Sequence, residues 1–221
     1  MSSSQVSVKR QRNSRLMQIL YIPWVDKTIA VVAILPNAIE LYHRYFVGNL
    51  SVPRAMLGIQ IVILIVTMLF RRTPVRVTPN PWFWLLAFVA TYGILAFTAF
   101  ASNGRSMVSS FVTTGLAVIS VAVLIYARLS LGRSIGFVPA NRGIVTTGAY
   151  RFVRHPIYTG IFIALASFVL RSYTPLNLAL AVSLVILFMI KSMVEERFLK
   201  DDAKYSTYLR QVRWRWFPGL A

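Results

Sequence analysis

Long hydrophobic runs, separated by short polar segments, fill most of the chain. Six runs are predicted to form helices, at about residues 26–46, 53–70, 79–101, 107–129, 157–170 and 176–194. Most of them reach the roughly 20 residues that a helix needs to cross a bilayer. The fifth run is short, and it pairs with the sixth as a predicted hairpin. The pattern therefore predicts an all-α integral membrane protein with five to six transmembrane helices.

The hydrophobic pattern also divides the chain into three parts. Residues 1–24 are polar and basic and are predicted to form a cytoplasmic tail, residues 25–129 hold the first four helices, and residues 130–221 form a more polar C-terminal core. The first predicted helix is interrupted by Pro36 and Glu40. A carboxylate inside a membrane span needs a partner or water, and we expect Glu40 to pair with Arg44 one turn later.

Composition supports the membrane class and limits the chemistry. Hydrophobic residues make up 57% of the chain, charged residues 14%, and the mean hydropathy is +0.63. An ordinary soluble domain has about 25% charged residues, so this class is excluded. The chain has no cysteine and only two histidines, which excludes disulfides and thiolate nucleophiles. No metal site is predicted, because an HExxH pattern is also missing.

The net charge of +18 is explained if the basic residues lie mainly on the cytoplasmic side of the membrane. With the N-terminus inside and six spans, twenty of the 24 Lys and Arg residues lie on the cytoplasmic side. This bias follows the positive-inside rule, so no nucleic-acid partner is needed to explain the charge. A multi-pass protein with cytoplasmic N- and C-termini is predicted. The sequence indicates no oligomeric state.

A polar cluster, GAYRFVRHPIYTG at Gly148–Gly160, lies between hydrophobic runs. Pro156 disfavours helix at His155 and suits the first turn of a following helix. The preceding side chains then lie near an open helix N-terminus, where an anion is favoured, and Arg154 offers a fork that suits a carboxylate. Two interpretations stay open: a site for a small molecule with a carboxylate, or a stop-transfer cluster at the lipid headgroups.

A second unusual segment, residues 195–215, carries four of the six acidic residues. Glu195 and Glu196 follow the last hydrophobic run, where anions at a helix C-terminus and beside anionic lipid are unfavourable. A positively charged ligand, or an arginine of the first segment, would explain them. Tyr205 and Tyr208 share a helix face, which is also typical of an amphipathic surface helix. We expect the two segments to meet at the cytoplasmic face and form one site.

These residues carry a resemblance to a known family. LGRSIGFVPANRGIVTTGAYRFVRHPIYTG, followed by EERFL and YSTYLRQVRWRWFP, resembles the isoprenylcysteine carboxyl methyltransferase family, which is related to the phospholipid methyltransferases. The resemblance covers about residues 129–218. It implies S-adenosylmethionine as cofactor, with a cofactor site formed by the 130–156 linker and the C-terminal segment.

The resemblance also implies site residues. The cofactor-binding set is Tyr150, His155, Pro156, Tyr158, Gly160, Glu195, Glu196 and Tyr205. Arg154 and Glu196 are the implied catalytic residues, together with one arginine of the tail. The tail has one residue more than the family pattern before its proline, so the pattern fits Arg210, Arg213 or Arg215, and of these we name Arg213.

The implied function is a membrane methyltransferase that acts on a lipidated or lipid-like acceptor. A carboxylate is the favoured acceptor group, since methyl transfer to an ionised carboxylate needs mainly positioning and desolvation. Two alternatives remain: a phospholipid or amine N-methyltransferase, in which a glutamate or tyrosine takes up a proton, and a non-catalytic membrane protein that retains the fold. The expected partners are the lipid bilayer and a lipophilic acceptor.

Overall fold

The computed structural model describes residues 52–136 and 138–219, and separate positions between residues 28 and 43. The predicted basic tail 1–24 lies outside the described residues. So does most of the first predicted helix, 26–46, including Glu40 and Arg44.

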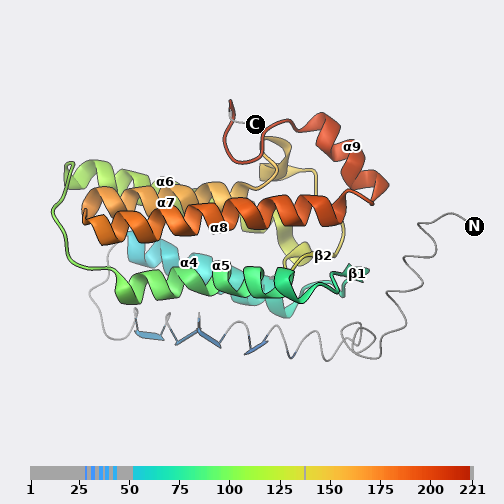
Figure 1. The fold of residues 1–221 in the computed structure, drawn as a ribbon, viewed down its shortest axis with the longest axis horizontal. Helices are drawn as coiled ribbons and strands as arrows, with labels where there is room; N and C mark the ends of the chain where they lie inside the picture. The colour runs from blue at the N-terminus through green and yellow to red at the C-terminus, as the bar shows by residue number, and fades with distance from the viewer. Residues whose placement is uncertain are drawn as a thin grey trace, which may run out of the picture.

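Five long helices run side by side and alternate in direction (Figure 1). They are α4 (Val52–Leu69), α5 (Pro81–Phe100), α6 (Ser110–Leu131), α7 (Pro156–Arg171) and α8 (Pro175–Leu199). Helix α6 packs against α4 and α7, and α8 packs against α5 and α7. Each helix begins within about three residues of the predicted start, so the hydrophobic pattern located these five helices correctly.

Polar caps and prolines fix where several helices begin. The side chain of Asn80 accepts a hydrogen bond from the Trp82 backbone N–H at 3.0 Å, directly before Pro81. Thr174 caps α8 in the same way, and Asp202 caps the short helix α9 (Ala203–Gln211). These side chains satisfy backbone N–H groups that have no partner inside the helix.

Within the described part of the chain, two helical stretches are long and apolar enough to cross a membrane. They are Ser110–Ser134 and Pro175–Leu199, while Pro81–Ile94 and Pro156–Arg171 are shorter apolar helices. Large apolar side chains point outward along these helices, among them Phe111, Ile119 and Ile186. An exposed apolar surface of this kind suits contact with lipid tails.

The linker between α6 and α7 folds over one end of the helix bundle, where α9 also lies (Figure 1). It contains two 3₁₀ turns, η1 (Gly132–Ser134) and η2 (Gly148–Arg151), and strand β2 (Ala140–Asn141). Strand β2 pairs antiparallel with β1 (Arg76–Val77), with Arg76 opposite Asn141. This two-stranded pairing is a small departure from the all-α prediction, and it ties the linker to the α4–α5 connection.

Candidate functional site

The two unusual polar segments lie against each other at this end of the bundle. The backbone N–H groups of Arg154 and His155 donate to the carbonyls of Trp214 and Arg215, at 2.9 and 2.8 Å. One turn into α7, the Thr159 hydroxyl donates to the carbonyl of Trp216. The C-terminal tail is therefore fixed along the start of α7, as the sequence led us to expect.

Glu196 is the centre of a buried ion cluster. Its Oε2 lies 3.2 Å from Arg154 Nη1 and 3.2 Å from Arg215 Nε, and its Oε1 lies 3.1 Å from His155 Nε2. Only 4% of the Glu196 side chain is exposed. Two guanidinium groups and the His155 ring thus compensate one buried carboxylate, which explains how an anion is tolerated at the end of an apolar helix.

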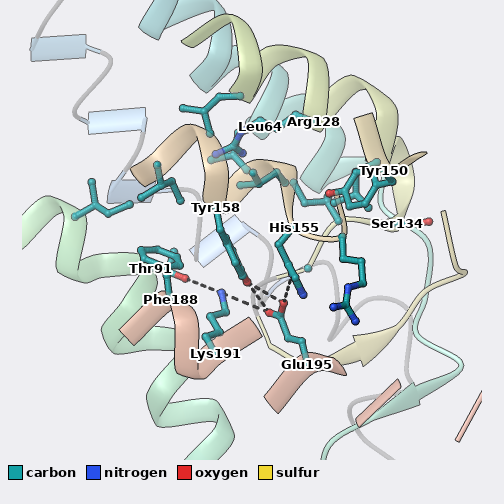
Figure 2. Close-up of a pocket in the computed structure, with 18 of the residues that line it drawn as sticks. Leu64, Thr91, Arg128, Ser134, Tyr150, His155, Tyr158, Phe188, Lys191 and Glu195 are labelled. Atoms are coloured by element: carbon teal, nitrogen blue, oxygen red, sulfur yellow. Dashed lines mark hydrogen bonds and ion pairs between the residues drawn. The ribbon is translucent and has the colours of Figure 1, made fainter. Parts of the chain in front are cut away.

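Glu195 faces a different set of partners (Figure 2). Both of its carboxylate oxygens accept from the Tyr158 hydroxyl at 2.8 Å, and Lys191 Nζ lies 3.8 Å away. His155 Nδ1 is 3.9 Å from Glu195, so the His155 ring lies between the two glutamates. The ring also stacks on Tyr158, with an interplanar angle of 5°. The Glu195 side chain is 21% exposed, so its carboxylate is accessible to a further partner.

A cavity of about 890 Å³ lies beside this cluster and runs between the helices. Its polar end is lined by Tyr150, Arg154, His155, Tyr158, Glu195 and Tyr205. Apolar side chains from α4 to α8 line the rest, including Ile61, Leu64, Ile94, Phe97, Val121, Leu124, Ile161, Leu165 and Phe188. The arrangement offers a polar compartment joined to an apolar one.

The tyrosines at the polar end remain protonated at neutral pH. Burial raises the pKa of Tyr150 well above its ordinary value, and the nearby Tyr208 adds to the shift. Burial also raises the pKa of Tyr205 and of Tyr208. The Tyr208 hydroxyl donates to the backbone carbonyl of Tyr150 at 2.7 Å, so α9 holds η2 in place. These phenols serve as hydrogen-bond donors and packing surfaces, and none is poised to take up a proton.

The structure brings most of the predicted site residues together. Tyr150, Arg154, His155, Tyr158, Glu195 and Tyr205 all line the cavity. Glu196 does not line it, and lies behind His155 and Arg154 as their shared counter-ion. Pro156 is buried at the first turn of α7 and also lies off the cavity wall.

Gly160 was predicted to line the cofactor site, but it lies where α7 packs on α6. A Cβ at this position would come within 2.7 Å of Leu124 Cγ. The Gly160 carbonyl accepts from the Ser120 hydroxyl of α6 at 2.8 Å. The close approach that we expected is therefore made by a neighbouring helix, and Gly160 is not among the residues that line the cavity.

The tail arginine that enters the cluster is Arg215 rather than Arg213. The Arg213 side chain is exposed, and its guanidinium lies 5.0 Å from the centre of the Trp214 ring. Arg213 contributes its backbone carbonyl, which accepts from Arg154 Nη2 at 3.1 Å. In an extended segment, side chains alternate in direction, so residues 213 and 215 are expected on the same side of the chain. Spacing alone therefore could not show which of the two enters the cluster.

Of the five Lys and Arg residues that line the cavity, sequence reasoning selected Arg154; among those that it missed are Arg128 and Lys191. Both lie inside helices that the hydrophobic pattern treated as spans. Lys191 is 5% exposed, with Nζ 3.5 Å from Thr91 Oγ1 and 5.6 Å from the centre of the Tyr158 ring. A signal was available, because a charged residue within an apolar helix usually marks a functional site.

A comparison with protein families agrees with this geometry. The family model described as phospholipid methyltransferase matches residues 107–205. The matched segment spans α6, the linker, α7, α8 and the beginning of α9, and thus every residue of the cavity's polar end. A comparison with curated proteins finds no match. The family match confirms the relation to phospholipid methyltransferases that the motifs indicated.

Proposed function

We propose, from the phospholipid methyltransferase match over residues 107–205, that this protein is an integral membrane methyltransferase that uses S-adenosylmethionine. In this proposal, the methyl group goes to a carboxylate of a lipidated or lipid-like acceptor. The single observation that carries the proposal is the shape and lining of the cavity. Its polar end is built from both motif segments, and its apolar remainder extends between the helices.

The residues at the polar end fit the cofactor. S-adenosylmethionine would supply an activated methyl group on a sulfonium, and it also carries an ammonium, a carboxylate and an adenine. Glu195 is the carboxylate on the cavity wall that suits the cationic groups. Tyr150 and Tyr205 offer apolar ring faces with hydroxyl donors. His155, held between two glutamates, offers a ring N–H.

Glu196 is a positioning residue in this proposal. It fixes the His155 ring through Nε2 and the Arg154 guanidinium through Nη1. Since it contacts Arg215 too, it also holds the tail over the start of α7. Side chains locked in this way lose little conformational freedom when a ligand binds, which favours both affinity and orientation.

The apolar part of the cavity suits the tail of the acceptor. Side chains from five helices line it, and burial of an alkyl chain contributes about 0.8 kcal/mol per CH₂ group. Arg154, which lines the polar end of the cavity, is suited to orient an acceptor carboxylate. The surrounding apolar wall excludes water, which makes an ionised carboxylate a better nucleophile.

The family description favours a second candidate, transfer to an amine headgroup. An amine must lose a proton during transfer, so this reaction needs a base. With the pKa values of Tyr150 and Tyr205 raised, Glu195 is the candidate base that lines the cavity. The two reactions give different products: a methyl ester releases methanol in alkali, whereas an N-methyl group is stable. Transfer of a radioactive methyl group to an added lipid extract, followed by alkali treatment, distinguishes them.

Cofactor binding tests the proposal directly. Isothermal titration calorimetry of S-adenosylmethionine should show saturable binding to the detergent-purified protein. His155→Ala should abolish it, because the mutation removes contacts to both glutamates. His43→Ala is the matched control, since His43 is the other histidine and lies away from the cavity. If wild-type protein that is folded shows no binding, the alternative of a non-catalytic membrane protein takes its place.

The proposal includes a multi-pass topology with the polar end of the cavity at the cytoplasmic face. Because the chain has no cysteine, single cysteines introduced at Ser106 and Thr207 report on opposite ends of the bundle. A membrane-impermeant maleimide added to intact cells should label Ser106→Cys and leave Thr207→Cys unlabelled. The opposite labelling pattern would refute this orientation.

A further inference from the structure

Arg128 is a charged side chain on the cavity wall that the proposed reaction has not used. It lies near the C-terminus of α6, in a stretch without any acidic residue. Its Nε is buried and has no hydrogen-bond partner. Within residues 52–136 and 138–219, no ion pair of Arg128 is found. A guanidinium stays charged under all physiological conditions.

The four described carboxylates are engaged elsewhere. Glu195 and Glu196 belong to the cluster around His155. Asp201 pairs with Arg76 at 3.0 Å, and Asp202 caps α9 while accepting from Asn141. The charge of Arg128 therefore has no acidic partner among the described residues. An uncompensated cation in a cavity with largely apolar walls is unfavourable unless an anion joins it.

The balance of charges on the cavity wall also favours an anionic ligand. Its wall carries five Lys and Arg residues and one carboxylate, Glu195. Figure 2 shows Arg128 on the α6 side of the cavity, across Tyr158 from Lys191 and Glu195. In the proposed function the cationic groups of the cofactor lie near Glu195. The part of the cavity near Arg128 is then left for an anionic group. A position in the last turn of α6 favours a cation only weakly, so the helix end alone does not explain a half-buried arginine whose Nε lacks a partner.

We propose that Arg128 binds an anionic group of the lipid-like acceptor, a carboxylate or a phosphate, and thereby selects anionic over neutral acceptors. This inference rests on the proposed function, because it places the acceptor in the same cavity. A bidentate contact between a guanidinium and an oxyanion is strong and directional. It would hold the polar end of the acceptor near the boundary between the two compartments.

The test measures binding of anionic and neutral lipids of similar chain length. Nitroxide-labelled stearic acid is bound to the full-length protein in detergent, and its displacement by stearic acid, hexadecyl phosphate and octadecanol is followed by electron paramagnetic resonance. Arg128→Gln should weaken binding of the anions by about ten- to hundredfold, as expected for a lost charge-assisted hydrogen bond, and leave octadecanol unchanged. Arg128→Lys should recover part of the loss. Arg197→Gln, on the exposed face of α8, is the matched control and should behave as wild type.

The outcomes separate the possibilities. Stronger displacement by stearic acid assigns the anion to an acceptor carboxylate, and stronger displacement by hexadecyl phosphate assigns it to a lipid phosphate; either result supports the proposal. Equal weakening of all three lipids, or none, overturns it. A loss confined to S-adenosylmethionine binding also overturns it, because the anion would then be the cofactor's own carboxylate.

The failure of this inference is distinguishable from failure of the proposed function. Calorimetry on Arg128→Gln should show unchanged cofactor binding, whereas His155→Ala should lose the cofactor and keep the preference for anionic lipids. If Arg128→Gln does not fold, photo-crosslinking of the wild type keeps the proposal testable. A fatty acid with a diazirine beside its carboxylate should label residues around Arg128 and Tyr150. Labelling elsewhere in the cavity would contradict the assignment.

Discussion

Replacing Glu196 by glutamine removes the carboxylate that Arg154, His155 and Arg215 share. Glu195→Gln is a matched change at the neighbouring position, with the same size and the same loss of charge. The two side chains differ in burial, since 4% of Glu196 and 21% of Glu195 are exposed. They also differ in partners, because Glu196 has three contacts at 3.1–3.2 Å while the Lys191 and His155 nitrogens near Glu195 lie at 3.8 and 3.9 Å.

The expected effect on stability follows from these contacts. Removal of one partner from a buried ion pair costs about 3–5 kcal/mol. The glutamine amide oxygen retains part of the bonding to Arg154 and Arg215, so we take the lower end, about 3 kcal/mol. For a chain of this size, 1 kcal/mol corresponds to about 2–4 °C in the unfolding midpoint. Glu196→Gln should therefore unfold about 6–12 °C below wild type, and Glu195→Gln within about 3 °C of it.

Thermal unfolding in detergent, followed by tryptophan fluorescence, measures the change in stability. Calorimetry with S-adenosylmethionine measures the change in cofactor affinity. Glu195→Gln should lose cofactor affinity by at least about tenfold while remaining folded. Glu196→Gln should lose both stability and affinity, because His155 and Arg154 lose their common counter-ion. The reasoning is refuted if Glu195→Gln destabilises the protein as much as Glu196→Gln, or if Glu196→Gln leaves the midpoint unchanged.

Three further predictions use the same stability assay or the same reaction. Arg215→Ala should reduce methyl transfer and lower the unfolding midpoint, whereas Arg213→Ala, which removes no cation from the cluster, should do neither; equal effects would contradict the assignment of the tail arginine. Gly160→Ala should destabilise the protein by about 1–3 kcal/mol through overpacking, since a Cβ there meets α6 at 2.7 Å, while Gly115→Ala, with open space around it, should be neutral or stabilising. Burial raises the pKa of Tyr205 above its ordinary 10.0, so the folded state favours the protonated phenol. The resulting contribution to the free energy of unfolding is complete below pH 10 and is lost as the pH rises further. The unfolding midpoint should fall above pH 10, and Tyr205→Phe should flatten this fall; an unchanged slope would argue against it.

The sequence predicted which segments form the site, but it did not predict the contacts of each residue within the site. Spacing and charge indicated that the Arg154–His155 segment and the Glu195–Glu196 segment belong together, and the contacts of Glu196 with Arg154 at 3.2 Å and with His155 at 3.1 Å confirm it. That Glu195 lines the cavity while Glu196 is buried away from it was not predictable. Neighbouring residues at a helix end point in directions about 100° apart, and only the surrounding helices decide which one reaches a cavity and which one is buried.

The hydrophobic pattern by itself determined the described helices, because each run of apolar side chains has a length and boundary set by local chemistry: prolines and caps at the start, polar turns at the end. Only the tertiary structure decided that Gly160 serves helix packing, that Arg215 enters the cluster, and that Arg128 faces the cavity. These facts depend on which helix lies opposite which, a relation between residues distant in the sequence that no local pattern encodes.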